Sequence, residues 1–424
     1  MRQITDELKV AAGIFALLLS GCSKDQSCAY SHSESTNSDW ATIQNIFDPD
    51  RLLEVELTLS CRDWDEIRHQ VRNEGSAYGS NCDQPPSNPF KYVPADISID
   101  GVRIPNVGLR KKGWYSSTEI GKPSLKVRFD KYVDGIKVDG YEQLTLNNCM
   151  ADPSLIRQCL AFGVLEAAGL PVPKYNFAHV RVNGKDLGIY AHIEGAKEKF
   201  LERHFSDVQG DFFEGTECDF RFGNGWIQRF SRQTNENVPG YGRIPALATA
   251  LESTDQDLLN ALDPLVDLDR FMTFWAAEVL VGHADGYAAS AANFYIYDDP
   301  TTGKFQFIPW DVDYTFDSEI DAASGVRSVY ANAQLAKRLY LLPATRAQYL
   351  ARLDSLLNTV WIESQLIASI DSMESLLDLH LTPANRSEIA KVRQYVLSLR
   401  ARIVPELTSG AVQTPDVLQS PCGS

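Results

Sequence analysis

The sequence predicts an α+β fold in which a sheet-rich N-terminal part precedes a helical C-terminal part. Short stretches of alternating apolar and polar residues, typical of half-buried strands, are concentrated in the first half of the chain. Segments with apolar residues at helical spacing dominate the second half. Strands followed by helices, rather than strands and helices in alternation, indicate an α+β arrangement. The 424 residues, of which 44% are hydrophobic, suffice for a sizeable core.

The strand pattern begins where apolar and polar residues alternate from Leu52 to Leu59. Two hairpins are predicted around Asp100-Gly101 and Asn183-Gly184, because Asp-Gly and Asn-Gly favour the tight turns that join antiparallel strands. Residues 61–94 are rich in Gly, Ser, Asn and Pro and are expected to form a long surface excursion. The predicted strands of this part are 52–59, 95–99, 102–111, 124–129, 143–146, 176–182 and 187–193.

The first long helix is expected after Asp152, which suits an N-cap, and Pro153, which suits the first turn. Apolar residues recur at helical spacing over 155–168, and Gly169 is placed to end this helix. Residues 218–241, rich in Gly, Asn, Arg and aromatic side chains, are expected to form a functional loop or a small insertion. Further helices are predicted over 196–204, 268–281 and 333–407, and further strands over 293–297 and 304–308.

The N-terminus has the features of an export signal. Basic residues precede an apolar run over 10–19, which is too short to span a bilayer and has the length of a signal-peptide core. The run ends in Leu19-Ser20-Gly21-Cys22, which looks like a bacterial lipobox. We therefore predict that 1–21 is a signal peptide and that 22–48 is a flexible tether. The protein is expected in a bacterial cell envelope, anchored through lipid on Cys22 and facing the periplasm or the cell surface.

The charge and the cysteines narrow the classes of partner and site. The formal net charge is −16, and a chain this acidic repels phosphate backbones, so we expect no nucleic-acid partner. Eight cysteines are present, and seven remain when Cys22 is set aside, which makes disulfides plausible in an oxidising compartment. No CxxC pair occurs, which disfavours a zinc ribbon. Proximity in the sequence suggests the pairs Cys61–Cys82 and Cys149–Cys159, although connectivity does not follow from sequence.

A first candidate segment for chemistry combines a Gly/Ser-bearing turn with a basic strand. The turn contains Gly113, Ser116 and Ser117, and Lys126 lies on the strand that follows. Alternation places Lys126 on one face of the strand and apolar residues on the other. Backbone N–H groups of such a turn can approach a phosphate, and a strand lysine can neutralise it.

A second group of candidates is acidic and lies after buried elements. Asp285 follows the apolar helix, Asn293 begins the next strand, and Asp311 and Asp313 follow the strand after that. Carboxylate and amide oxygens are the ligands that Mg²⁺ prefers in proteins. An aspartate that does not bind the metal could accept a proton from an attacking hydroxyl. Each aspartate alone would more often be a cap or turn residue, so the prediction depends on the whole set in this order.

Several segments together resemble the CotH family of atypical, kinase-like proteins of spore coats. The most diagnostic one is Ile308-Pro309-Trp310-Asp311-Val312-Asp313-Tyr314-Thr315-Phe316. The resemblance covers roughly 54–317 and continues more loosely toward the C-terminus. The other segments that carry it are 122–131, 146–157, 182–194 and 200–203.

The resemblance implies a diverged protein-kinase-like fold with two lobes that binds ATP and Mg²⁺. The kinase-like domain would span 49–408, with an N-lobe over about 49–194, a C-lobe over about 195–408, and a tail over 409–424.

Individual roles follow from the same resemblance. Lys126 would contact the phosphates, Glu166 would be its ion-pair partner, and Glu194 would lie near the adenine. The turn with Gly113, Ser116 and Ser117 would cover the nucleotide. Asp285 would be the catalytic-loop aspartate, Asn293 and Asp311 would hold the metal, and Asp313 would be a further ligand.

The leading function is transfer of the ATP γ-phosphoryl group to Ser or Thr of an unidentified surface or secreted protein. One alternative keeps the ATP site and attaches glutamate to a protein, because a fold does not fix its reaction. Another is a non-catalytic surface or adhesion module, which need not bind ATP. Other chemistries are disfavoured because no Walker A, GxSxG or HExxH motif occurs.

Overall fold

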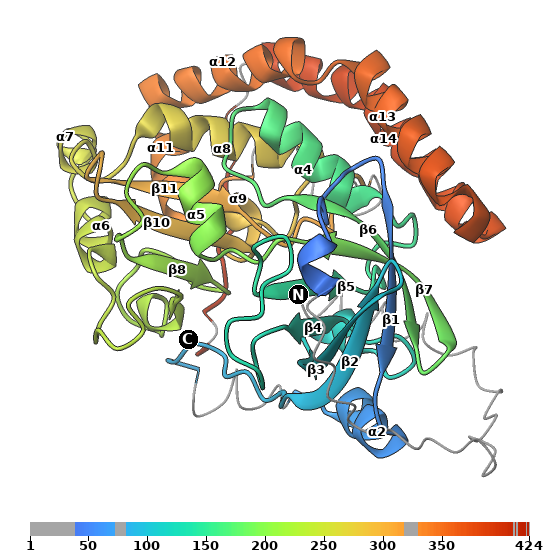
Figure 1. The fold of residues 1–424 in the computed structure, drawn as a ribbon. Coiled ribbons are helices and arrows are strands. Elements are labelled where there is room, and N and C mark those ends of the chain that lie inside the picture. Colours follow the sequence, from blue (N-terminus) through green and yellow to red (C-terminus); the bar gives the residue numbers. More distant parts are fainter. Residues whose placement is uncertain are drawn as a thin grey trace.

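The computed structural model describes residues 39–72, 82–317, 330–409, 412, 414–420 and 422–423. The predicted signal peptide, Cys22 and most of the predicted tether lie outside these residues. Two lobes are seen in Figure 1: a barrel of strands from the N-terminal part and a second lobe in which helices surround a smaller sheet. The predicted α+β fold, with a sheet-rich N-terminal and a helical C-terminal part, is confirmed.

The N-lobe is a closed barrel whose strands follow the order β1-β2-β3-β4-β5-β7-β6. Neighbouring strands are antiparallel except β1 and β6, whose parallel pairing closes the barrel. Alternate residues of each strand fill its interior, as the period of two requires. The strands are β1 (Leu52–Thr58), β2 (Val93–Ile99), β3 (Val102–Lys111), β4 (Leu125–Arg128), β5 (Gln143–Asn147), β6 (Tyr175–Val182) and β7 (Lys185–Ile193).

Both predicted hairpins form at the predicted turns. Asp100 and Gly101 join β2 to β3, and Asn183 and Gly184 join β6 to β7, all with positive φ, as a type I′ turn requires. The predicted surface excursion is partly wrong, because its first residues form helix α2 (Cys61–His69). Ser60 caps this helix by accepting a hydrogen bond from the Asp63 N–H at 3.0 Å.

Helix α4 (Arg157–Ala167) lies between the lobes and packs against β6 and two C-lobe helices, α8 (Leu268–Val281) and α13 (Glu363–Leu377). It starts later than predicted. Asp152 does not cap it directly but accepts hydrogen bonds from the N–H groups of Ser154 and Arg157, at 3.0 and 2.7 Å, and so orders the turn before it. Gly169 ends the helix with φ of 79°, as predicted.

The C-lobe contains a four-stranded sheet in the order β11-β10-β8-β9. The two predicted strands are confirmed as β10 (Phe294–Asp299) and β11 (Lys304–Pro309). β8 (Phe212–Gly215) and β9 (Ser231–Arg232) extend the sheet without having been predicted, and β9 lies in the predicted 218–241 loop together with η3 (Ile227–Arg229).

Helices cover this sheet and, as Figure 1 shows, α12 (Pro343–Thr359), α13 and α14 (Pro383–Ser409) form a long outer layer. Helix α8 matches its predicted span of 268–281. The other helices of the lobe are α5 (Glu198–His204), α6 (Ile244–Leu251), α7 (Leu258–Leu262), α9 (Tyr287–Ser290), α11 (Gln334–Leu341) and η4 (Asp378–His380).

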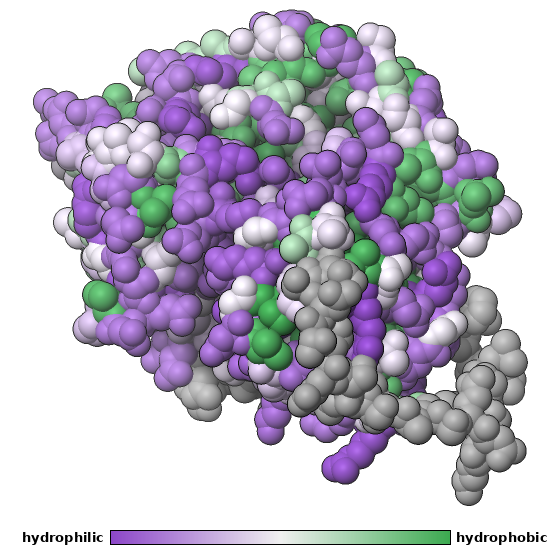
Figure 2. Space-filling model, viewed as in Figure 1, coloured by the Kyte–Doolittle hydropathy of each residue, from purple (hydrophilic) through white to green (hydrophobic). Residues whose placement is uncertain are grey.

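The hydrophobic core is divided between the two lobes. One apolar cluster fills the barrel, and a larger one joins α4, the C-lobe sheet and the C-lobe helices. Figure 2 shows a face on which hydrophilic residues predominate and apolar ones form small, separate groups, in keeping with the net charge of −16. Among the described helices, none is both long and apolar enough to cross a bilayer.

The predicted cysteine pairs are wrong. Cys82 is joined to Cys422, because the C-terminal segment returns across the molecule, with the Asp416 N–H donating to Asn332 Oδ1 at 2.8 Å. Cys61 is also disulfide-bonded, and not to Cys82. Cys149 and Cys159 are buried free thiols that donate to different carbonyls, those of Asn147 and Asn176.

Candidate active site

The acidic candidates meet where the C-lobe sheet ends. β10 and β11 pair so that Phe294 lies opposite Pro309, and the residues just outside this pair emerge together. The Trp310 N–H donates to the Asn293 carbonyl at 3.2 Å and extends this pairing by one step. The two partly exposed residues Asn293 and Asp311 are thereby placed at the same end of the sheet.

Asp285 is held beside this pair by Asn293. The Asn293 Nδ2 donates to Asp285 Oδ2 at 2.7 Å and to the Asp285 carbonyl at 3.0 Å. This leaves the side-chain oxygen of Asn293, Oδ1, as the side-chain atom that can bind an ion. Asn293 and Asp311 have φ of 49° and 46°, a left-handed conformation that is uncommon outside glycine and often marks functional sites.

The carboxylates of the site influence one another strongly. Removal from water raises the pKa of Asp285 to about 6, against the opposing effects of His283 and Asn293. Burial also raises the pKa of Asp313 well above its usual range, and the carboxylates of Asp311, Asp152 and Asp285 add to the effect. Such an excess of negative charge in a partly buried place fits a divalent cation, and the oxygen donors are those that Mg²⁺ prefers.

The barrel presents cations to this acidic group. Lys126 lies on β4 with its side chain out of the barrel core, directly opposite Arg110 on β3. Burial and, to a smaller extent, the positive charges of Arg110, Lys197 and Lys112 together lower the pKa of Lys126 to about 7. A site that collects this much positive charge next to carboxylates is suited to a phosphate chain and its metal ion.

Glu214 on β8 is the carboxylate whose field favours the charged form of Lys126. Burial raises the pKa of Glu214, and Asp311 raises it further, while Lys126 and Lys112 act in the opposite direction. Glu214 therefore lies between the basic and acidic halves of the site. No sequence pattern had singled it out, since β8 is a short strand without a recognisable motif.

A chain of side chains links the two lobes. Lys112 donates to Asn147 Oδ1, Asn147 Nδ2 donates to Gln158 Oε1 at 2.9 Å, and Gln158 Nε2 donates to Asp311 Oδ1 at 3.4 Å. Burial lowers the pKa of Lys112, while the charges of Asp311 and Asp313 raise it. These three linking residues were not predicted as site residues, although Lys112 directly precedes the Gly113 turn and Asn147 lies in a segment that carried the resemblance.

The predicted partner of Lys126 is misplaced. Glu166 is exposed at the far end of α4, where its charge acts on Tyr175 and Arg203. Gln158 is the residue of α4 that reaches the site. The two lie eight positions apart, which corresponds to about 12 Å along a helix axis, so Glu166 is too far along the helix to share the same partners.

Glu194 lies at the predicted junction between the lobes, but its carboxylate is already engaged. It is buried, forms an ion pair with Arg203, and accepts a hydrogen bond from the Lys174 N–H at 2.9 Å. A nucleotide at this junction would therefore meet backbone groups rather than this side chain.

The predicted phosphate turn has a specific backbone. Gly113 has φ of 96°, and a Cβ there would lie 2.3 Å from the Cβ of Ser117, so both conformation and space require glycine. The Ser117 N–H, in the short η2 (Tyr115–Thr118), donates to the carbonyl of Trp114, which directly precedes η2, at 2.9 Å. The side chain of Ser116 lies outside the described part of the structure.

Comparison with known proteins supports the same family as the motifs. The model of the family described as CotH kinase protein matches residues 109–401. Inner spore coat protein H of Bacillus subtilis is 29% identical over 198 residues, which are 43% of this chain and 52% of that protein. Invasin CotH2 of Rhizopus delemar is 26% identical over 191 residues, 42% of this chain and 32% of that protein. The match thus spans about half the length of the first relative and about a third of the second.

Solved structures with a distant likeness include two proteins. The proinflammatory kinase CtkA of Helicobacter pylori is 12% identical, with a TM-score of 0.35 over 68% of this chain and 93% of CtkA. A chain in the complex of HipA, HipB and operator DNA from Shewanella oneidensis is also 12% identical, with a TM-score of 0.32 over 64% of this chain and 61% of that chain.

Proposed function

We propose, because this chain belongs to the CotH kinase protein family, that it is an ATP- and Mg²⁺-dependent transferase that phosphorylates Ser or Thr of another protein. The observation that carries the proposal is the meeting of Asp285, Asn293, Asp311 and Asp313 from the C-lobe with Lys112 and Lys126 from the barrel.

Asp311, Asp313 and Asn293 are the residues that would hold the metal ion. Their oxygen atoms suit Mg²⁺, and the raised pKa of Asp313 reflects negative charge that a divalent ion would offset. Bound there, Mg²⁺ would neutralise the charge that builds up on the phosphate oxygens during transfer.

The barrel side of the site would hold the nucleotide. Lys126 and Lys112 are placed to offset the charge of the phosphates, and the Gly113 turn is placed to offer backbone N–H groups to them. The adenine is proposed to lie against the backbone next to Glu194, since the carboxylate of Glu194 is occupied by Arg203.

Asp285 is proposed as the proton acceptor. With a pKa of about 6 it is mostly ionised at neutral pH, and Asn293 orients it through Oδ2. The acceptor hydroxyl oxygen would bond to the γ-phosphorus, the bond from that phosphorus to the bridging oxygen would break, and the hydroxyl proton would pass to Asp285. The products are the phosphorylated protein and ADP.

Export and anchoring through lipid on Cys22 remain part of the proposal. The disulfide between Cys82 and Cys422 supports an oxidising compartment, because such bonds are rare in cytosolic proteins. The names of the two relatives, a spore coat protein and an invasin, are compatible with a surface location for this chain too. The acceptor is accordingly proposed to be a surface or secreted protein.

Calorimetry of the full chain with ATP, with and without Mg²⁺, tests the proposal directly. We expect Mg²⁺-dependent binding in the wild type, and then a mass increase of phosphate on an acceptor protein or on the chain itself. A mass increase of glutamate would redirect the proposal to the other transfer reaction. Absence of ATP binding by folded protein would overturn it in favour of a non-catalytic surface module.

A further inference from the structure

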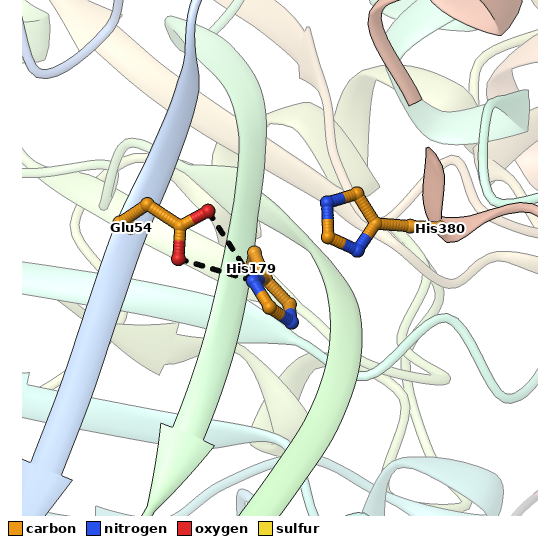
Figure 3. A group of neighbouring side chains, drawn as sticks. All are labelled: Glu54, His179 and His380. Atoms are coloured by element: carbon orange, nitrogen blue, oxygen red, sulfur yellow. Dashed lines mark hydrogen bonds and ion pairs between the residues drawn. The ribbon is translucent and has the colours of Figure 1, made fainter. Parts of the chain in front are cut away.

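A second cluster of potential ligands lies at the junction of the lobes, away from the residues assigned to the active site. It consists of Glu54 on β1, His179 on β6 and His380 on η4 of the C-lobe, as Figure 3 shows. Glu54 and His179 are direct neighbours in the parallel pairing that closes the barrel. Ala178 and Val180 point into the barrel core, so the side chain of His179 between them points outward to the C-lobe. The ring centroids of His179 and His380 are 4.3 Å apart.

The distances in this cluster suit a metal ion. One ligand atom from each of the three residues lies within 4.8 Å of the others. Donors around a tetrahedral ion with bonds of about 2.0–2.1 Å lie about 3.3 Å apart. Glu54 and His179 already meet this, since His179 Nδ1 lies 3.0 and 3.3 Å from the two carboxylate oxygens. The half-exposed Glu54 and partly exposed His380 side chains can adjust by the remaining distance.

Asp186 supplies the support that metal-binding histidines usually have. His179 Nε2 lies 2.9 Å from Asp186 Oδ1, on the side of the ring away from Glu54. Metal-ligating histidines typically donate their second N–H to a carboxylate, which fixes the tautomer and leaves the other nitrogen for the ion. When Nε2–H donates to Asp186, His179 Nδ1 carries a lone pair that points toward Glu54. His179 Nδ1 and the Glu54 carboxylate are then two acceptors that face each other, an arrangement that a cation between them would stabilise.

Arg181 is the cation now present beside this pair. Its Nη1 donates to Glu54 Oε2 at 3.0 Å, and its Nη2 lies 3.2 Å from His179 Nδ1. Its side chain is 41% exposed and can turn into solvent without leaving a buried charge behind. A divalent ion would therefore compete with Arg181 for the same two ligands.

We propose that Glu54, His179 and His380 bind a Zn²⁺-like divalent ion that ties the barrel to the C-lobe. Two imidazoles and one carboxylate form a ligand set that suits Zn²⁺, with water in the remaining position. Because His380 lies between α13 and α14 and the other two ligands lie on barrel strands, the ion joins the lobes at a place that the nucleotide site does not occupy.

The test is calorimetry of Zn²⁺ binding to the full chain, purified through a tag without histidine and with excess Mg²⁺ to cover the active-site carboxylates. We expect His380→Ala to lower the affinity by about 100-fold or more, since even supporting residues are worth about 10–100-fold. Asp186→Asn should cost about 10–100-fold. His69→Ala, which removes an exposed histidine of α2, and Asp311→Ala should leave this binding unchanged.

Arg181→Ala separates coordination from a network of ion pairs. If Zn²⁺ displaces the guanidinium, this variant binds Zn²⁺ as tightly as the wild type or more tightly. A loss comparable to that of His380→Ala would overturn the proposal, as would equal Zn²⁺ affinity in wild type and His380→Ala. His380 lies on a surface turn, so its variant reports on the ion even if His179→Ala fails to fold.

Discussion

The two lobes contribute opposite charges to the candidate active site, and they do so with different kinds of backbone. The barrel supplies Lys126 and Arg110 from paired positions within two neighbouring strands. The C-lobe supplies Asp311 and Asn293 from left-handed residues just beyond strand ends. The cations are thus fixed by a closed sheet, whereas the carboxylates are held by local turns in an uncommon conformation.

This difference between the lobes indicates which kind of ligand each half of the site requires. Burial and the neighbouring carboxylates both raise the pKa of Asp313, so the C-lobe half of the site is complete only with a metal ion. Burial and the neighbouring positive charges, that of Arg110 foremost, depress the pKa of Lys126, so the basic half is complete only with an anion. A phosphate chain that carries Mg²⁺ satisfies both halves at once.

The largest effect is expected when a proposed metal ligand of the C-lobe is removed. We expect Asp311→Ala to lower Mg²⁺-dependent ATP affinity by about 100-fold or more, because the ion supplies several kcal/mol of charge stabilisation. Calorimetry with and without Mg²⁺ measures the effect. Asp263→Ala, which removes an exposed carboxylate of the same lobe, serves as control and should bind as the wild type does. Equal Mg²⁺ dependence in both variants would contradict the assignment.

Asp285→Asn should separate chemistry from binding. The change removes a proton acceptor and keeps the size of the side chain, so we expect the rate of transfer to fall by about 10²–10⁴-fold. ATP affinity should stay within a few-fold of the wild type, since Asp285 is not assigned to the metal. Single-turnover assays and calorimetry give the two quantities. A variant with full transfer activity would remove Asp285 from its role.

Lys126→Met tests the barrel side. The lysine is expected to interact with phosphate oxygens, and charged hydrogen bonds of this kind are worth about 1.5–3 kcal/mol, or roughly 10–100-fold in affinity. ATP binding should weaken by that factor while Mg²⁺ alone still binds. The control is Lys131→Met, just beyond the same strand and exposed, which should have no effect.

The fold could largely be predicted from the sequence because its signals are local. The Asp100-Gly101 and Asn183-Gly184 turns and the apolar run of α8 each act within a few residues, and the structure has the predicted elements there. Helix α2 was missed because the Gly- and Pro-rich sequence after it outweighed its Ser60 cap. β8 and β9 were missed because strands of four and two residues have little periodicity of their own.

The site residues that could be predicted are those that lie next to elements recognisable in the sequence. Asp285, Asn293, Asp311 and Asp313 could be recognised because buried elements precede or follow them closely, and the structure brings them together. Gln158 and Glu214 could not be recognised from the sequence, because their contacts with the site depend on how α4 and β8 pack against the rest of the fold. The misplaced Glu166 has the same cause: the pattern identified the helix but not which of its ends faces the site.

A fully buried histidine of the barrel is expected to affect stability. His192 on β7 is fully buried, stacks on Phe47 with ring centroids 4.2 Å apart, and has its pKa lowered by burial to about 3. Between that value and its unfolded pKa of about 6.5, only the unfolded state takes up the proton, so stability falls as pH falls, by up to about 1.4 kcal/mol per pH unit.

Urea unfolding at several pH values, with a chelator present to exclude bound metal, checks this expectation. His192→Phe keeps an aromatic ring against Phe47 and cannot titrate. Its stability should therefore depend less steeply on pH than that of the wild type between pH 6.5 and about 4. Parallel pH dependence in the two proteins would show that acid destabilisation arises elsewhere.

The smallest expected effect concerns the connection between the halves of the site, and α4 offers a matched pair of variants for it. Gln158→Ala removes the link from Asn147 to Asp311, whose bond to Gln158 is long at 3.4 Å. A typical hydrogen bond is worth about 0.5–1.5 kcal/mol, so we expect a loss of about 2–10-fold in Mg²⁺-dependent ATP affinity. Glu166→Ala, on the same helix but at its exposed end, should change nothing. The reverse result, a loss with Glu166→Ala alone, would mean that the lobes rearrange on binding so that the far end of α4 reaches Lys126.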